Sequence, residues 1–279
     1  GVDETDKIVA LGGLGPLAEY ADRLGLTDGF ASAVPYRGAA MPVVDRGGLL
    51  VHSLLMLNAG GDCCTDLGML HPAEGVLGNV GSETTLRRMI TDMAKTPGST
   101  GAVDDVMREV RTRVWAEHGW SNPGRRVTLD IDATLTPAHS EKEDAKGNYK
   151  RGFGFHPVAC FADCSGEALA VEHRPGNAGA NTIADLVGII DAGLDALPET
   201  VAASHRPGAI AAEATNEILV RSDSAGHTLG FLWDMSDRDI RFCVTGRSNN
   251  ILSSVILAFD DNTNWQQALG PHNVNLDDP

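Results

Sequence analysis

The hydrophobic pattern of this 279-residue chain changes once, at about Arg125, and the change separates two kinds of structure. Before it, apolar residues recur three and four positions apart in the segments 8–36, 49–57, 85–93 and 103–114, which is typical of amphipathic helices. After it, VTLDIDATL alternates apolar and polar residues, which is typical of a strand with one buried face. We therefore predict a helical region over residues 1–122, an α/β domain over residues 123–250 and a tail over residues 251–279.

The α/β domain is expected to have the element order βββαβαβ. In its first strand Val127, Leu129 and Ile131 share one face, whereas Asp130 and Asp132 share the other. GFHPVACFA and EALAVEH predict the next two strands, which the tight turn DCSG joins into a hairpin. A helix over 183–197, the strand EILVR, a helix over 229–233 and the strand IRFCVTG complete the order.

Net charge limits the partners that the chain can bind. The sequence has 22 basic and 38 acidic residues, a net charge of -16, whereas nucleic-acid binding favours Lys and Arg, which displace phosphate counterions. Most of the acid lies in residues 127–279, with a net charge of -12, and residues 1–126 have a net charge of -4. Between Arg108 and Arg126 five arginines outnumber two glutamates, so a local basic patch is expected on an acidic protein.

The sequence also limits the compartment. No stretch approaches the roughly 20 apolar residues of a membrane span, and the chain starts with the acidic GVDETDK instead of a basic leader. Five cysteines, an odd number with Cys63 and Cys64 adjacent, argue against a disulfide framework. We expect a protein of the reducing cytoplasm that does not bind a membrane.

Two aspartates follow predicted strands at places suited to a divalent metal ion. Asp132 lies at the end of the first strand before a polar loop, and Asp223 follows EILVR before a helix. If the two strands are parallel neighbours, their carboxyl ends form one crevice, where carboxylates and waters can hold Mg²⁺. The alternative is that each aspartate only accepts hydrogen bonds from loop amides.

A serine hydrolase is a second hypothesis from the same segment. SDSAG, residues 222–226, resembles the end of the G-x-S-x-G nucleophile elbow, which would make Ser224 the nucleophile. The first small residue is Ser instead of Gly, and the acid and base would come from Asp260, Asp261 or His272 without a supporting pattern. This hypothesis is therefore the weaker one.

Two further kinds of site are disfavoured. The spacing of His156, Cys160, Cys164 and His173 within a strand and turn is not that of a zinc ligand set, so packing and turn roles are expected for them. The chain has no G-x-x-x-x-G-K-[ST] motif, which disfavours a P-loop nucleotide enzyme.

Several blocks together resemble the DDE transposases of bacterial insertion sequences, most closely the thirteen-eighty group. The blocks are, in order, VTLDIDATL, HSEKEDAKGNYKRGFGFHP, FADCSGEALA, RPGNAGANT and ILVRSDSAG. The resemblance extends from about residue 8 to about residue 255. Agreement of several blocks in one order is more specific than any single motif.

The resemblance implies an α/β RNase H-like catalytic domain, in which the first and fourth strands are parallel neighbours. It makes Asp132 and Asp223 catalytic metal ligands, with Asp130 as the alternative for the first position. In the complete site two Mg²⁺ or Mn²⁺ ions activate water and then a 3′ hydroxyl for DNA strand cleavage and transfer. We favour Asp132 over Asp130 because it lies nearer the end of the strand.

The implied partners are the terminal inverted repeats of the element and target DNA, and a homodimer is one option for the assembly. Basic residues are expected to contact phosphates in the helical region and beside the metal site: Arg87, Arg88, Arg111, Arg113, Lys150, Arg151 and Arg174. The alternative for these side chains is a solvated surface without a DNA role.

The sequence departs from the family in its third acid. The family has a Glu in a later motif of the Tyr-x-x-Arg-Glu-Lys type, and here no Glu follows Glu217. The remaining candidates before the terminal LDDP are Asp234, Asp237, Asp239, Asp260 and Asp261. We expect the chain to stop within the family's β-rich insertion and to be inactive or incomplete as a transposase by itself. A non-catalytic DNA-binding remnant is the alternative function.

Overall fold

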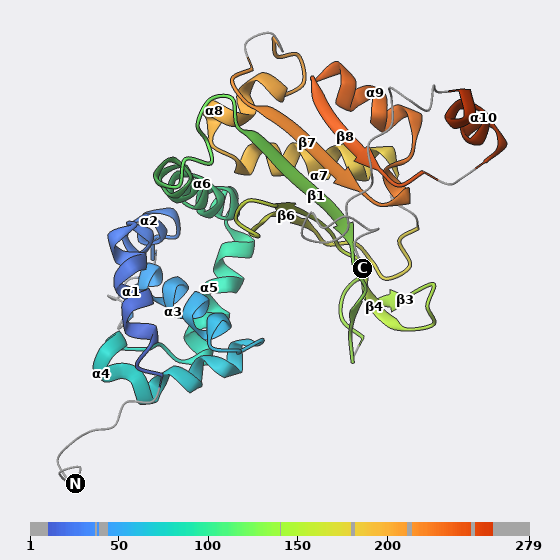
Figure 1. Ribbon diagram of the computed structural model, residues 1–279. Helices are drawn as coiled ribbons and strands as arrows, with labels where there is room; N and C mark the ends of the chain where they lie inside the picture. Colours follow the sequence, from blue (N-terminus) through green and yellow to red (C-terminus); the bar gives the residue numbers. More distant parts are fainter. Residues whose placement is uncertain are drawn as a thin grey trace, which may run out of the picture.

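The structure of the protein, a computed structural model, describes residues 11–36, 38, 44–139, 141–179, 182–210, 214–246 and 249–258. A cluster of helices comes first in the chain and an α/β unit built on a sheet follows it (Figure 1). The long helix α6 (Ser99–Glu117) lies between the two parts in this view. None of the described helices is long and apolar enough to cross a membrane.

The helical part consists of short elements around one apolar core. Its helices before α6 are α1 (Leu14–Arg23), α2 (Leu26–Ala33), α3 (Arg46–Asn58), the 3-10 helix η1 (Cys64–Ala73), α4 (Glu74–Leu77) and α5 (Glu83–Lys95). Ser82 caps the start of α5, because Ser82 Oγ accepts a hydrogen bond from the Thr85 N–H at 3.2 Å. Phe30, Leu49 and Leu86 belong to the buried core that these helices share.

Within residues 8–36 the apolar spacing up to Leu24 predicts one helix and then its exit. In the described part that helix is confirmed as α1, but the spacing does not predict the second helix, α2. The chain forms α1 and α2 with a break between them, and residues 8–10 lie outside the described part. The break is at Gly25, whose φ of 74° lies in the left-handed region that a glycine adopts without strain. The Gly25 N–H bonds the Asp22 carbonyl, which ends α1, and α2 then starts in a new direction.

The α/β unit has a five-stranded sheet of order β6-β5-β1-β7-β8. Its strands are β1 (Arg126–Ala133), β5 (Val158–Ala162), β6 (Ala168–Glu172), β7 (Glu217–Ser222) and β8 (Ile240–Val244). β1 pairs antiparallel with β5 and parallel with β7, and β7 pairs parallel with β8. With the sheet strands counted along the chain, the order is 3-2-1-4-5, which is the RNase H-like arrangement, so the predicted fold class and the order βββαβαβ are confirmed.

Helices α7 (Ile183–Ala196) and α9 (Leu229–Asp237) pack on one face of this sheet. Alternation explains the burial, because Val127, Leu129 and Ile131 of β1 point into the core while the residues between them point to the other face. α7 begins with a capping box between Thr182 and Asp185. The remaining helices are α8 (Glu199–Ala202), the 3-10 helices η2 (Ala203–His205) and η4 (Ser224–Gly226), and α10 (Asn250–Ala258).

The predicted strand GFHPVACFA is two strands in different sheets. β4 (Phe153–Phe155) pairs with β2 (Thr136–Pro137) and β3 (Lys146–Gly147) in a small sheet, whereas β5 joins the large one. The chain turns at Pro157, which has no N–H for a ladder and restricts the residue before it. The predicted hairpin of β5 and β6 is confirmed.

A partly buried ion pair joins the helical part to the α/β unit. Glu167, at the turn before β6, accepts hydrogen bonds from Arg111 Nε at 2.8 Å and Trp115 Nε1 at 2.8 Å. Arg111 also donates to the carbonyl of Ala196 at the end of α7 at 2.7 Å. The Arg111 side chain is 6% exposed and that of Glu167 is 31% exposed, so a partly buried charge pair fixes α6 to the sheet edge, and a further hydrogen bond fixes it to α7.

We expect Arg111→Ala to destabilise the protein by about 2 kcal/mol, because it removes the charged donor of a partly buried pair. The Glu167 carboxylate would lose its charged donor, and the Ala196 carbonyl would lose a hydrogen bond. The free energy of urea unfolding, followed by circular dichroism, measures the change.

Arg113→Ala is the matched control on the same helix. Arg113 is 47% exposed and pairs with Glu109 at 3.6 Å, so its loss is expected to cost less than about 1 kcal/mol. Equal unfolding energies for the two variants would show that the ion pair does not hold the two parts together.

Candidate functional site

The carboxyl ends of β1 and β7 bring Asp132 and Asp223 together. The parallel register pairs Ile131 with Ser222, and one residue further along both strands come Asp132 and Asp223. Register partners in a parallel ladder lie on neighbouring strands roughly 4.8 Å apart. Both aspartates line one open surface pocket of about 380 Å³. The sequence-predicted pair is therefore adjacent in the structure.

Each of these carboxylates keeps one oxygen available. Asp132 Oδ1 accepts the N–H of Ala133 at 2.9 Å, and Asp223 Oδ1 accepts the N–H of Ala225 at 2.8 Å. Within the described part of the chain, neither second oxygen has a hydrogen-bond donor. Both residues are exposed. Mg²⁺ and Mn²⁺ prefer carboxylate oxygens and waters as ligands. Two free carboxylate oxygens at an open pocket therefore suit such an ion.

Asp130 lines the same pocket but is bound to a basic side chain. Arg221 of β7 donates from Nε and from its terminal nitrogen to the two oxygens of Asp130 at 2.5 and 2.6 Å. The same guanidinium donates to Asp163 at 2.6 Å. The hydrogen bonds that Arg221 donates, first those to Asp130 and then that to Asp163, raise the pKa of Arg221 above its ordinary value. A carboxylate with both oxygens in such a pair is a poorer metal ligand than Asp132.

No pattern in the sequence singles out Arg221 before the fold is known. The available signal is its position, because an arginine at the end of EILVR lies opposite Asp130 only if β1 and β7 are in this register. Arg221 thus pairs with Asp130 and Asp163, whereas Asp132 and Asp223 have no such basic partner among the described residues.

The turn after β7 sets the position of Asp223. Asp223 caps the short helix η4, whose Gly226 lies against the end of the sheet. A Cβ at Gly226 would come within 2.8 Å of the Ser222 side chain, so this close approach requires glycine. Among the described residues no histidine or carboxylate bonds Ser224 Oγ, and Asp260, Asp261 and His272 lie outside them. The described residues show no hydrolase triad.

The described candidates for a third acid do not reach the pocket. Asp234 of α9 pairs with Arg238 at 3.0 Å. Asp237 ends α9 and Asp239 directly precedes β8, so both lie near the amino end of that strand. Asp132 and Asp223 lie at the opposite, carboxyl ends of the parallel strands.

Of the arginines predicted to meet DNA in the helical part, three are on the surface. Arg87 and Arg88 lie on α5, and Arg87 pairs with Glu83 at 2.6 Å. Arg113 lies on α6 beside Glu109. These side chains are accessible to a phosphate.

The prediction that Arg111 and Arg174 contact DNA does not fit their burial. Arg111 belongs to the partly buried pair with Glu167. The Arg174 side chain is 7% exposed and donates to the His156 carbonyl and to Asp185, each at 3.1 Å. Both are structural, because a buried guanidinium that satisfies fold contacts cannot also reach a phosphate on the surface. Lys150 and Arg151, by contrast, are exposed at the tip of the β3–β4 turn.

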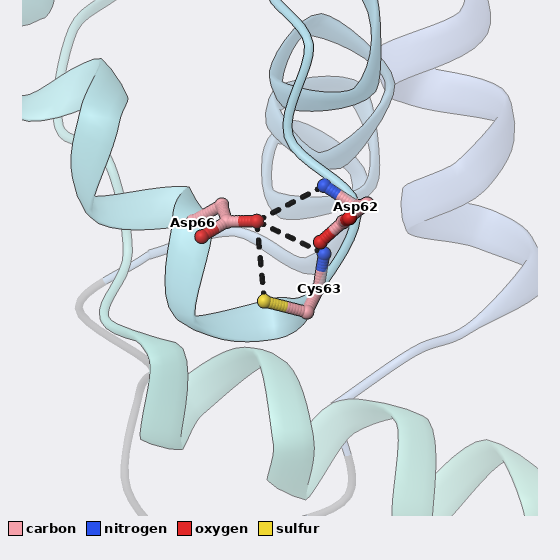
Figure 2. A group of neighbouring side chains, drawn as sticks. All are labelled: Asp62, Cys63 and Asp66. Carbon is pink, nitrogen blue, oxygen red and sulfur yellow. Dashed lines mark hydrogen bonds between the residues drawn. The ribbon is translucent and has the colours of Figure 1, made fainter. Parts of the chain in front are cut away.

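The described residues contain one group of three potential metal ligands elsewhere, Asp62, Cys63 and Asp66 (Figure 2). Its geometry is explained by helix capping. Asp66 Oδ2 accepts the N–H groups of Asp62 at 3.0 Å and Cys63 at 3.1 Å, and also the Cys63 thiol. The hydrogen bond from the Asp62 backbone, followed by those from Cys63, lowers the pKa of Asp66. The Asp66 carboxylate therefore caps the start of η1, and its hydrogen bonds need no metal ion to explain them.

Among the described residues, His156, Cys160, Cys164 and His173 do not form a group close enough to share one metal ion. All five cysteines are free. Cys160 faces the core from β5, and burial, together with the nearby Asp130, raises the pKa of its thiol to about 12.

We expect iodoacetamide at pH 8 to alkylate the exposed Cys63 and Cys243 of the folded protein but not Cys160. With its raised pKa only about one Cys160 thiol in ten thousand is ionised at that pH, and the buried sulfur is inaccessible. Mass spectrometry of peptides measures the labelling, and unfolding in urea should make Cys160 reactive. Equal labelling rates of Cys160 and Cys63 in the folded state would contradict its buried position.

Three solved structures of low similarity involve the Mos1 transposase. The pre-cleavage Mos1 transpososome is 10% identical over 84% of this chain and 78% of that one, with a TM-score of 0.26. The paired-end complex with the left transposon end is 10% identical over 75% and 61%, with a TM-score of 0.27. The mariner paired-end complex with Mn is 10% identical over 80% and 66%, with a TM-score of 0.27.

At TM-scores this low the chain does not superpose as a whole on any of the three structures. The chain spans between 61% and 78% of their lengths. No curated protein matches the chain significantly. The transposase DDE domain group 1 family, in contrast, matches residues 4–274, nearly the whole sequence. The chain belongs to the transposase DDE domain group 1 family.

Proposed function

We propose that Asp132 and Asp223 of this chain are two metal ligands of a DNA transposase site for strand cleavage and transfer, which the chain by itself leaves incomplete because its third acid is missing. The observation that supports this most is their placement at adjacent carboxyl ends of β1 and β7, each with an oxygen that the fold does not use. Membership of a transposase family supports DNA as the substrate. We propose the terminal inverted repeats of the element and a target DNA as its partners.

The residues at this site have different proposed roles. Asp132 and Asp223 would hold the ions, and divalent metal there would supply activation of the attacking oxygen and stabilisation of the leaving oxygen. Arg221 neutralises Asp130 and Asp163 beside them. In this proposal the exposed Lys150 and Arg151 would contact the DNA backbone close to the site, and the exposed Arg87, Arg88 and Arg113 would contact it at the helical part.

We expect the protein to bind Mn²⁺ weakly, and Asp132→Asn and Asp223→Asn each to abolish the binding. Two carboxylates with waters hold a divalent ion poorly, and an amide removes the charge while keeping the size of the side chain. Isothermal titration calorimetry of the folded variants measures this affinity.

Asp130→Asn is the matched control in the same pocket. Because Arg221 already binds Asp130, its loss should leave Mn²⁺ affinity within about threefold. If Asp130→Asn alone abolished binding, Asp130 and not Asp132 would be the first ligand. Unchanged binding in both the Asp132 and Asp223 variants would remove them from the site.

We expect residues 1–279 alone to cleave DNA only at a background rate. The second metal ion normally has a third acid, and among the described residues Asp234, Asp237 and Asp239 lie elsewhere. Cleavage of a labelled duplex that carries the inverted repeat, with Mg²⁺, measures the rate. Robust cleavage would contradict this expectation, and it would point to Asp260 or Asp261 as the substitute ligand.

The alternative function is a DNA-binding protein without catalysis. It is a candidate because the residues proposed to contact DNA differ from those proposed to hold the metal ions. A gel shift with the inverted repeat detects binding in either case. Arg88→Glu should weaken the shift without changing Mn²⁺ affinity, since Arg88 is exposed on α5, away from the metal ligands. Loss of the shift in Asp223→Asn, with a normal fold, would instead connect DNA binding to the metal site.

A further inference from the structure

A second pocket adjoins the metal site and shares Asp223 with it. It has a volume of about 760 Å³, within the range of small-molecule sites. One wall is the β3–β4 turn with Asn148 and Tyr149, another is the loop 177–179, and Asp223 and Ser224 form the side toward the metal ligands. A group held here would lie directly beside the atoms bound at Asp223.

Tyr149 presents an unusually open aromatic ring to this pocket. The residue is 72% exposed, although an aromatic ring of this size is normally at least half buried. The Lys150 ammonium lies 5.6 Å from the ring centroid, and the His156 ring centroid lies 6.0 Å away. The Lys150 ammonium thus lies over one face of the ring, and the exposed ring keeps apolar surface that a ligand can contact.

The turn that carries Tyr149 is held firmly. Asn148 donates its N–H to the Gly152 carbonyl at 2.8 Å, and its side-chain oxygen accepts the N–H groups of Lys150 at 3.0 Å and Gly152 at 2.9 Å. Arg151 adopts a φ of 64°, a conformation that costs free energy for a residue with a Cβ and persists only where its surroundings enforce it. The backbone on either side of Tyr149 is thus fixed, so a planar group that stacks on the ring does not have to order the turn.

The chemistry of the pocket matches one nucleotide of a DNA strand. An aromatic face accepts a planar base, whichever base it is. The exposed Lys150 and Arg151 can contact the attached phosphate. Asp223 lies at the other side of the pocket. Because its carboxylate and a phosphate are both negatively charged, the phosphate of the same strand would approach it only through a metal ion.

We propose that this pocket binds an unstacked base of the DNA strand whose phosphate lies at Asp132 and Asp223, with Tyr149 as the stacking platform. The inference rests on the proposed function, since it takes DNA as the substrate of that site. Removing a base from the helix stack allows the neighbouring phosphate to approach the metal ligands at the end of the sheet. Tyr149 is a positioning residue in this arrangement, because it contacts a base and not the reacting atoms.

The test uses the full chain with Mn²⁺ and two fluorescein-labelled single strands of 12 nucleotides, oligothymidylate and the same backbone without bases. Fluorescence anisotropy at low salt measures both affinities. We expect Tyr149→Ala to weaken oligothymidylate binding about tenfold and to leave binding of the baseless strand unchanged. Tyr149→Phe, which keeps the ring, should bind as the unaltered protein does.

Two control variants separate stacking from other effects. Trp233→Ala removes an exposed aromatic residue that does not line the pocket, and should change neither affinity. Lys150→Ala should weaken both strands equally, because a phosphate contact does not depend on the base. Unchanged Mn²⁺ affinity and circular dichroism in Tyr149→Ala would show that the metal site and fold are intact.

The outcomes distinguish this inference from the function on which it rests. If the unaltered protein binds both strands and Tyr149→Ala weakens neither, or weakens both equally, the base pocket is refuted while DNA binding stands. If the unaltered protein binds neither strand, the base pocket is refuted, whereas the proposed function fails only if the gel shift with the inverted repeat is also negative. A loss confined to oligothymidylate supports the pocket.

Discussion

The parallel pairing of β1 with β7 is the constraint on which the rest of the α/β unit depends. These strands are distant in the sequence, and the ladder between them fixes which side chains share a face. Their buried residues join α7 and α9 in one core, so a slip of one residue would turn Val127 and Leu129 toward solvent. The same register aligns Asp132 with Asp223 and Asp130 with Arg221. The packing of the core and the placement of the candidate ligands therefore have one cause.

A second constraint is the polar junction at Glu167. Its carboxylate accepts hydrogen bonds from Arg111, Trp115 and Ser165, which come from α6 and from the turn after β5. Because α6 also packs in the helical core, this junction ties the helical part to the sheet edge that carries β5 and β6. Arg111 belongs to the arginine-rich segment from which a basic patch is predicted, but this junction buries its side chain. The accessible basic residues are fewer than the sequence indicates.

Local patterns predict most of the elements, and long-range contacts explain the failures. Alternation in VTLDIDATL and helical spacing over 183–197 identify β1 and α7 because each periodicity reflects one buried face. The split of GFHPVACFA into β4 and β5 depends on pairing with β2 and β3, which are only two residues long and leave no periodic signal. The burial of Arg174 depends in the same way on Asp185, eleven residues later. The candidate ligands are visible in the sequence, but their adjacency requires the register.

The net charge of -16 is a poor guide to this site, because the fold sets the local charge. Arg221 compensates Asp130 and Asp163, and Arg238 compensates Asp191 and Asp234, so several acids near the sheet are neutralised within the chain. At the ends of β1 and β7, Asp132 and Asp223 keep their charge without such a partner among the described residues. Two adjacent carboxylates repel both one another and a DNA phosphate, and a divalent cation removes both repulsions. The acidic pair is thus consistent with binding DNA only as part of a metal complex.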